Sequence, residues 1–99
     1  MTMSTTKDGI IQVCREIEGI LLAKNEAYGD SALNPVRVFS KADTIEQINV
    51  RIDDKLSRIA RGKDYGDEDT ELDLIGYLVL KRVARSTTKN QAAASLRGA

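Results

Sequence analysis

The stretch from Lys24 to Ser31 holds more kinds of side chain than the end of a helix requires. It reads Lys-Asn-Glu-Ala-Tyr-Gly-Asp-Ser and offers an ammonium, an amide, a phenol, carboxylates and a hydroxyl within eight residues. A glycine or asparagine with a few polar neighbours is enough to end a helix. The stretch is therefore either a capping segment or part of a binding site, with Lys24, Asn25, Tyr28 and Asp30 as candidate ligand contacts.

A second group of charges follows one face of a later segment. Arg51, Lys55 and Arg58 are spaced i, i+4 and i+7, so on a helix they share one stripe. Asp54 lies three residues after Arg51 and four before Arg58, within reach of both. Ion pairs on a solvated face would explain the pattern, but three cations around one carboxylate exceed what local pairing needs. A phosphate group would suit the surplus charge, because it accepts charge-assisted hydrogen bonds.

A third candidate is Asp73, which lies between Leu72 and Leu74 and one helical turn before Tyr77. This segment is the least polar part of the chain. A carboxylate in such surroundings needs a cation, a metal ion or a basic partner to offset its lost hydration.

Apolar spacing predicts three helices that position these residues, at about residues 8–27, 44–61 and 68–85. Thr5, Thr6 or Asp8 is the expected N-cap of the first helix, and Gly29 its stop. Asp43 followed by Glu46 resembles a capping box at the start of the second helix.

The third predicted helix begins in an acidic cluster, which suits the positive end of a helix dipole. It is apolar on nearly every side. We therefore expect it to be the buried helix of a bundle or the helix that meets a partner chain. Gly76 in its middle costs about 1 kcal/mol against alanine and indicates the close approach of another helix or of a ligand.

The length is that of one small domain, and the three predicted helices make it an expected all-α domain over residues 1–86. The chain has 99 residues, of which 41% are hydrophobic and 30% charged, with three Tyr, one Phe and no Trp. The core must be aliphatic and small, so self-association is expected to complete a three-helix unit. Residues 87–99 are expected to form a flexible tail. Basic residues without acids from Lys81 onward give only a weak indication of nucleic-acid contact.

Several function classes are excluded by what the sequence lacks. The chain has no His, which removes Ser-His and Cys-His catalysis and His-ligated zinc. Its single Cys14 falls in an apolar helical pattern, so we expect a buried, inert thiol. No apolar run is long enough to span a membrane, and the start is not typical of a signal peptide. The cytosol is the expected location.

The ordered set of motifs from Ile10 to Val83 resembles the phage and bacterial family called nucleotide modification associated domain 1. The motifs that carry the resemblance are Lys24-Asn25, Tyr28-Gly29-Asp30-Ser31, Arg51, Asp54-Lys55, Arg58, Asp69 and Asp73-Leu74-x-Gly76-Tyr77. That family is similar to the MazG-like all-α nucleoside triphosphate pyrophosphohydrolases, which are dimeric or tetrameric helical bundles. For a phage-encoded chain, the expected cytosol is that of the host.

The resemblance implies a magnesium site. In the pyrophosphohydrolases, Glu-x-x-Glu on one helix and Glu-x-x-Asp on the next bind Mg²⁺, which bridges the phosphates and water. Asp73 matches the terminal Asp of the second pair, but Thr70 stands in place of its Glu, and Asp53 and Asp54 replace the two glutamates. The implied metal ligands are Asp54, Asp69 and Asp73, with Asp54 and Asp73 as catalytic residues.

Three hypotheses follow for the function. The first is a magnesium-dependent enzyme that cleaves a nucleoside triphosphate between its α- and β-phosphates. The second is a protein that binds a nucleotide or a nucleotide signal without cleaving it. The third is a helical interaction module whose charges are only surface features. In the first two, Lys24 and Tyr28 are expected to face Arg51, Asp73 and Tyr77 across one site, within the chain or across a dimer.

Overall fold

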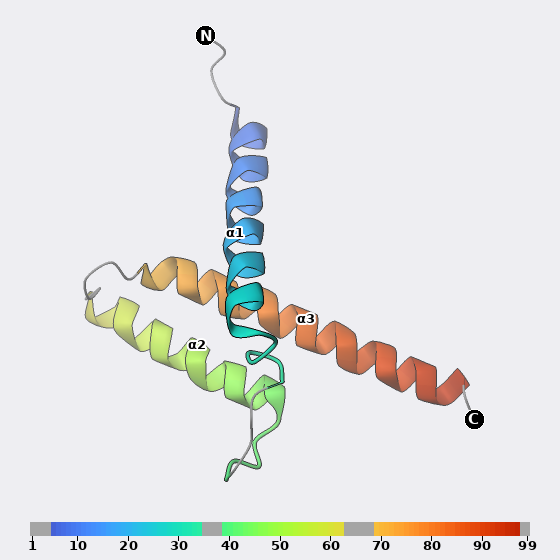
Figure 1. Cartoon of the computed structure of the whole chain (residues 1–99). Coiled ribbons are helices and arrows are strands. Elements are labelled where there is room, and N and C mark those ends of the chain that lie inside the picture. The colour runs from blue at the N-terminus through green and yellow to red at the C-terminus, as the bar shows by residue number, and fades with distance from the viewer. Residues whose placement is uncertain (1–4, 35–38, 63–68, 98–99) are drawn as a thin grey trace. The chain divides into compact units, whose positions relative to one another are not determined.

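The computed structural model describes residues 5–34, 39–62 and 69–97, with side chains as far as Thr87. It contains three α-helices: α1 (Thr6–Tyr28), α2 (Thr44–Arg61) and α3 (Thr70–Arg97) (Figure 1). No strand occurs within those ranges. The all-α prediction is confirmed, and α2 has the predicted bounds.

The third helix is longer than predicted. We expected its end near residue 85 and a flexible tail over 87–99, whereas the backbone is helical to Arg97. The extension contains Ala92, Ala93 and Ala94 and has neither Gly nor Pro before Gly98. Alanine has the highest intrinsic helix propensity, so this segment favours a helix although it has no apolar stripe to bury.

The chain groups into two compact units, Met1–Ser31 and Ala32–Ala99. The first contains α1, and the second contains α2 and α3. The single domain over 1–86 and its completion by self-association stay predictions. Among the described helices, none has the length and apolar character needed to cross a lipid bilayer.

Local hydrogen bonds fix both ends of α1. Thr5 is the N-cap, the first of the three candidates, and forms a capping box with Asp8. The Asp8 backbone N–H donates to Thr5 Oγ1 at 3.1 Å, and the Thr5 N–H donates to Asp8 Oδ2 at 3.4 Å. Gly29 follows the helix with a φ of 63°, a backbone conformation that favours glycine.

The apolar side chains of α1 are not buried. No residue of the helix falls in the buried class, and Ile10, Val13 and Leu22 are more than half exposed. Cys14 is also exposed, so the prediction of a buried thiol is wrong. The reason is that the described residues of the first unit, 5–31, contain no second helix or strand to cover the apolar stripe of α1.

The second unit is an antiparallel helical hairpin with a small aliphatic core (Figure 1). Ile48 and Ile52 of α2 and Ala84 of α3 are buried in its centre. Five partly buried side chains pack around them: Leu33, Ile45, Leu74, Tyr77 and Leu80. Gly76, where we predicted a close approach, is also buried. Isoleucines three and four residues apart lie on one face of a helix, so the spacing of α2 directs them at α3.

The N-cap of α2 gives a first prediction. Asp43 Oδ1 accepts a 2.8 Å hydrogen bond from the Glu46 backbone N–H, the first half of the predicted capping box. We expect Asp43→Ala to lower the free energy of unfolding by about 1 kcal/mol, since it leaves helix N–H groups without this acceptor. Urea unfolding followed by circular dichroism measures the change.

The matched control is Asp53→Ala, which removes an exposed carboxylate from the body of the same helix. It should change stability by less than about 0.5 kcal/mol, as surface substitutions usually do. Equal losses in both variants would show that charge, and not capping, is responsible.

Candidate functional site

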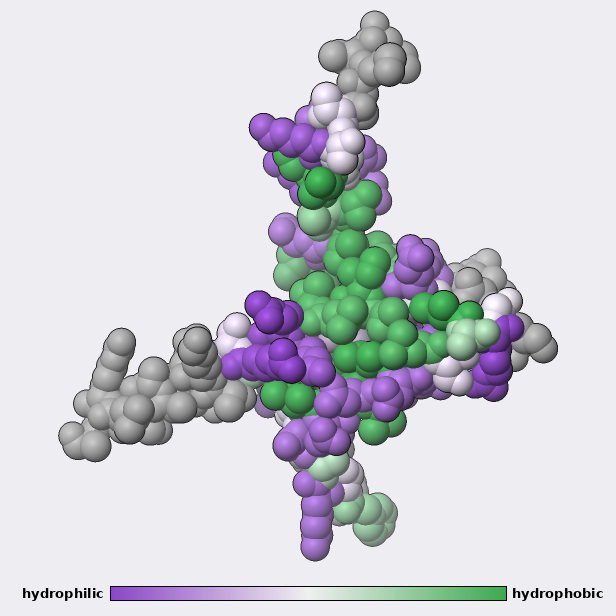
Figure 2. All heavy atoms as spheres, turned by 180° about the vertical axis from the view of Figure 1, so that it is seen from behind, coloured by the Kyte–Doolittle hydropathy of each residue, from purple (hydrophilic) through white to green (hydrophobic). Residues whose placement is uncertain are grey.

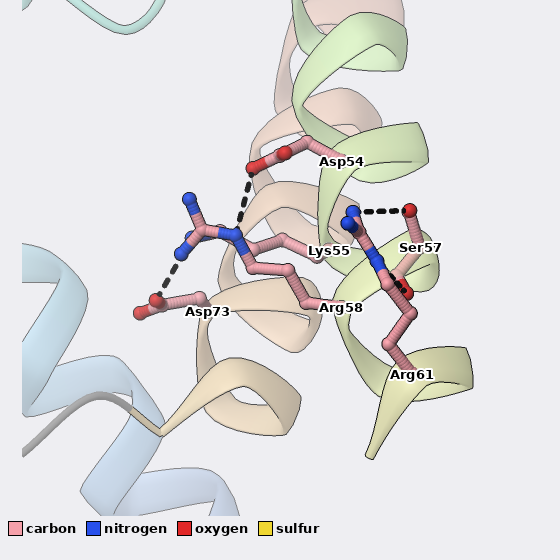
Figure 3. A network of polar contacts seen from close by, with 6 residues as sticks. All are labelled: Asp54, Lys55, Ser57, Arg58, Arg61 and Asp73. Atoms are coloured by element: carbon pink, nitrogen blue, oxygen red, sulfur yellow. Dashed lines mark hydrogen bonds and ion pairs between the residues drawn. The ribbon is translucent and has the colours of Figure 1, made fainter. Parts of the chain in front are cut away.

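The candidate site is the charged edge of the α2–α3 hairpin (Figure 3). Asp54, Lys55 and Arg58 project from α2, and Asp73 projects from the first turn of α3. Lys55 follows the buried Ile52 by three residues, so it borders the apolar face of α2. This position lets its aliphatic stem run along the core while its ammonium reaches α3.

Lys55 and Asp73 form an ion pair that joins the two helices. Lys55 Nζ lies 3.3 Å from Asp73 Oδ2, and the two side chains are only 11% and 25% exposed. We predicted that Asp73 would need a cation, a metal ion or a basic partner. Within the structure, Lys55 supplies the cation.

The second ion pair lies within α2 and is more open to solvent. Arg58 Nε is 3.4 Å from Asp54 Oδ2, with side chains 30% and 45% exposed. The sequence placed both Arg51 and Arg58 within reach of Asp54, and the structure pairs Asp54 with Arg58. Exposed pairs of this spacing contribute only a few tenths of a kcal/mol to stability. The effect of this contact is mainly to orient the guanidinium of Arg58.

Arg51 differs from the other two cations of the stripe. Its side chain is exposed and forms no hydrogen bond or ion pair within the described part of the chain. Its guanidinium therefore keeps all its donors for water or for a ligand.

Two residues that the sequence reasoning missed extend this edge toward the end of α2. Arg61 Nη2 donates to Ser57 Oγ at 2.8 Å, and Arg61 Nε donates to the Ser57 carbonyl oxygen at 3.4 Å (Figure 3). The i, i+4 spacing of Ser57 and Arg61 was the available signal. Arg61 follows Arg58 in the last turn of the helix, and its guanidinium turns toward Ser57 (Figure 3).

Tyr77 and Asp69 have structural contacts in the second unit. Tyr77 packs against the buried cluster of the hairpin. Asp69 Oδ1 accepts a 3.0 Å hydrogen bond from the Leu72 N–H, and the Asp69 carbonyl accepts one from the Asp73 N–H. These bonds place Asp69 at the cap position of α3.

The three predicted magnesium ligands do not gather into one donor set. Within the described residues, no three or more Asp, Glu, His or Cys side chains are grouped so that they would hold a metal ion. Asp54 and Asp73 each face a cation, and Asp69 caps a helix. This arrangement does not fit a bound magnesium ion, and magnesium dependence stays a prediction.

The stretch from Lys24 to Ser31 lies in the first unit and closes the end of α1. Asn25 Nδ2 donates to the Gly29 carbonyl oxygen and to Asp30 Oδ1, both at 3.4 Å. Lys24 and Tyr28 are exposed, and Tyr28 retains 73% of its accessible surface. The contacts of Asn25 support the capping interpretation. That Lys24 and Tyr28 share one site with Arg51 and Asp73 stays a prediction.

Comparison with known proteins found no match among family models, curated proteins or solved structures.

The two ion pairs give a second prediction. We expect Asp73→Ala to lower the free energy of unfolding by about 2 kcal/mol, because it leaves the mostly buried Lys55 ammonium without a partner. Asp54→Ala is the matched control on the same edge. It should cost less than about 0.5 kcal/mol, since its pair is open to water.

A double variant separates the ion pair from the packing around it. Lys55→Met combined with Asp73→Leu removes both charges and keeps apolar volume, so we expect stability near or above that of the wild type. Urea unfolding of all variants measures these differences. If Asp73→Ala cost no more than Asp54→Ala, the ion pair would not hold the hairpin together.

Proposed function

We propose that the charged edge of the α2–α3 hairpin binds the phosphate groups of a nucleotide. The observation that carries the proposal is the exposed guanidinium of Arg51, which has no partner among the described residues and shares a stripe of α2 with Lys55 and the oriented Arg58. Guanidinium groups hold phosphates through paired, charge-assisted hydrogen bonds.

The local charge balance supports an anionic ligand. On the α2 side of the edge, the three cations Arg51, Lys55 and Arg58 stand beside one carboxylate, Asp54, which gives this stripe a formal charge of +2 (3 − 1). On the α3 side, Asp69 and Asp73 add two carboxylates, so the positive excess belongs to the stripe of α2. The whole chain is neutral, with 15 basic and 15 acidic residues, so this excess is a local feature.

The ion pairs assign different tasks to the cations. The Lys55 side chain is 11% exposed and its ammonium is paired with Asp73. Its charge would therefore attract a phosphate group without contacting it directly. Arg51 and Arg58 are the groups that would contact phosphate oxygens directly. The Asp54 carboxylate would hold Arg58 in place before the ligand arrives, which lowers the entropic cost of binding.

Binding is better supported than hydrolysis. A magnesium ion at Asp54 and Asp73 would have to displace Arg58 and Lys55 from these carboxylates, and Asp69 is a helix cap. The resemblance to pyrophosphohydrolases supports a magnesium-dependent reaction, and oxygen ligands of this type suit that ion. Assays with magnesium and with a chelator distinguish the two outcomes.

Titration calorimetry with each nucleoside triphosphate, canonical or modified, tests the proposal. Arg51→Ala should weaken the affinity for the tightest ligand by about tenfold or more, since a hydrogen bond to a charged group is worth about 1.5–3 kcal/mol. Fold stability should not change, because Arg51 has no partner in the described structure. The affinity should also fall as salt is added, because an exposed cation is readily screened.

Arg15→Ala is the matched control, because it removes an exposed guanidinium from α1 without touching the edge. It should leave the affinity unchanged. Binding that survives a chelator, with no monophosphate or pyrophosphate released in magnesium, would support the non-catalytic form of the proposal. If no nucleotide binds, or if Arg15→Ala weakens binding as much as Arg51→Ala, the proposal is wrong.

A further inference from the structure

Among the described residues of the second unit, Phe39 is the most exposed large apolar side chain. It lies in the loop before α2 and keeps 94% of its accessible surface. Hydrophobic side chains also reach the surface along α1 and along α3 (Figure 2), but those side chains lie on helices. Phenylalanine is one of the side chains most often buried, because its ring gains more than most from leaving water. The ring of Phe39 makes no such gain within the described fold.

The backbone next to Phe39 is held to the start of α2 by hydrogen bonds. Gln47 Nε2 donates to Ser40 Oγ and to the Ala42 carbonyl oxygen, both at 3.3 Å. The Ala42 backbone N–H donates to the same Ser40 Oγ at 3.2 Å. These bonds fix the residue that follows Phe39, while the ring itself stays outside the core of the hairpin.

Gln47, which holds this loop, belongs to the stripe of α2 that carries the cations. It lies four residues before Arg51 and eight before Lys55, so these side chains follow one another along one side of the helix. At a rise of 1.5 Å per residue, Arg51 is about 6 Å further along the helix axis than Gln47, and Arg58 is about 16 Å further. The sugar and phosphate chain of a single nucleotide can bridge the distance from the loop to these guanidinium groups.

The second unit has one other described aromatic side chain, Tyr77. It packs against the buried cluster of Ile48, Ile52 and Ala84, so its ring is partly covered within the hairpin. Phe39 is therefore the described aromatic ring of this unit that a flat ligand could cover over a whole face.

We propose that Phe39 stacks on the nucleobase of a nucleotide whose phosphates lie at Arg51 and Arg58. This inference rests on the proposed phosphate site and adds a contact for the other end of the ligand. A base and an aromatic side chain attract each other and shield each other's faces from water. Every base has such a face, so Phe39 would favour nucleotides over other polyphosphates without selecting one base.

Titration calorimetry with the four canonical nucleoside triphosphates and with inorganic triphosphate separates the base from the phosphates. We expect the wild type to bind the nucleoside triphosphates about tenfold or more tighter than inorganic triphosphate, because only they can stack on Phe39. Phe39→Ala should lose this advantage and keep its affinity for inorganic triphosphate. Its free energy of unfolding should not change, since the ring is 94% exposed.

Val50→Ala is the matched control, because it removes a 64% exposed apolar side chain from α2. It should bind both kinds of ligand as the wild type does. Arg51→Ala should weaken both kinds, since each presents phosphates to the stripe. The two positions thus give different patterns: Phe39 affects only ligands with a base, and Arg51 affects every ligand.

A tryptophan at the same position reports stacking directly. The chain contains no Trp, so Phe39→Trp introduces a single indole. We expect this variant to bind nucleoside triphosphates at least as tightly as the wild type, because the indole offers a larger face. Nucleoside triphosphates should quench its fluorescence on binding, and inorganic triphosphate should not.

The inference is wrong if nucleoside triphosphates and inorganic triphosphate bind the wild type equally, if Phe39→Ala binds nucleotides as the wild type does, or if binding leaves the indole fluorescence unchanged. Any of these results, together with weaker binding by Arg51→Ala, would leave the phosphate site standing. Weaker binding by Phe39→Ala but not by Arg51→Ala would overturn the phosphate site, and this inference with it.

Discussion

The ion pair between Lys55 and Asp73 links the two helices of the second unit at the border of their core. Among the described residues of the hairpin, only Ile48, Ile52 and Ala84 are buried in the hydrophobic core, so apolar packing alone does little to fix how the helices slide or rotate. An ion pair at the border of that core adds a contact with one geometry, because each partner, if displaced, would be left poorly hydrated. The same pair brings positive charge from α2 to the edge where α3 begins.

The position of this ion pair explains how α2 both packs against α3 and carries a row of cations. The face of α2 that carries Ile48 and Ile52 meets α3, and the next positions around the helix carry cations. Lys55 stands between the two faces and takes part in both. Because Asp73 pairs with Lys55 and Asp54 pairs with Arg58, the stripe of α2 keeps a positive excess while its least exposed cation has a partner. This balance is the basis of the proposal that the edge binds an anionic ligand.

The apolar surface left on α1 and α3 sets a second constraint. A chain of this size buries little of its surface when it folds alone, and two-layer packing of α2 on α3 covers one face of each helix. Exposed apolar side chains remain on both α1 and α3, among them Ile10, Val13 and Leu22 of the first helix and Val79 and Val83 of the third.

The sequence by itself determined the local features of this protein. It predicted three helices, the bounds of α2, the Asp43 cap and the need of Asp73 for a partner, because each depends on spacing within about one or two turns. It misjudged the end of α3, where propensity without periodicity sustains the helix. Only the tertiary structure decided that Lys55 is the partner of Asp73, that Tyr77 packs on the core and that Cys14 is exposed. These outcomes depend on the rotation and register of one helix against another, which are set by packing and not by the order of residues along either helix.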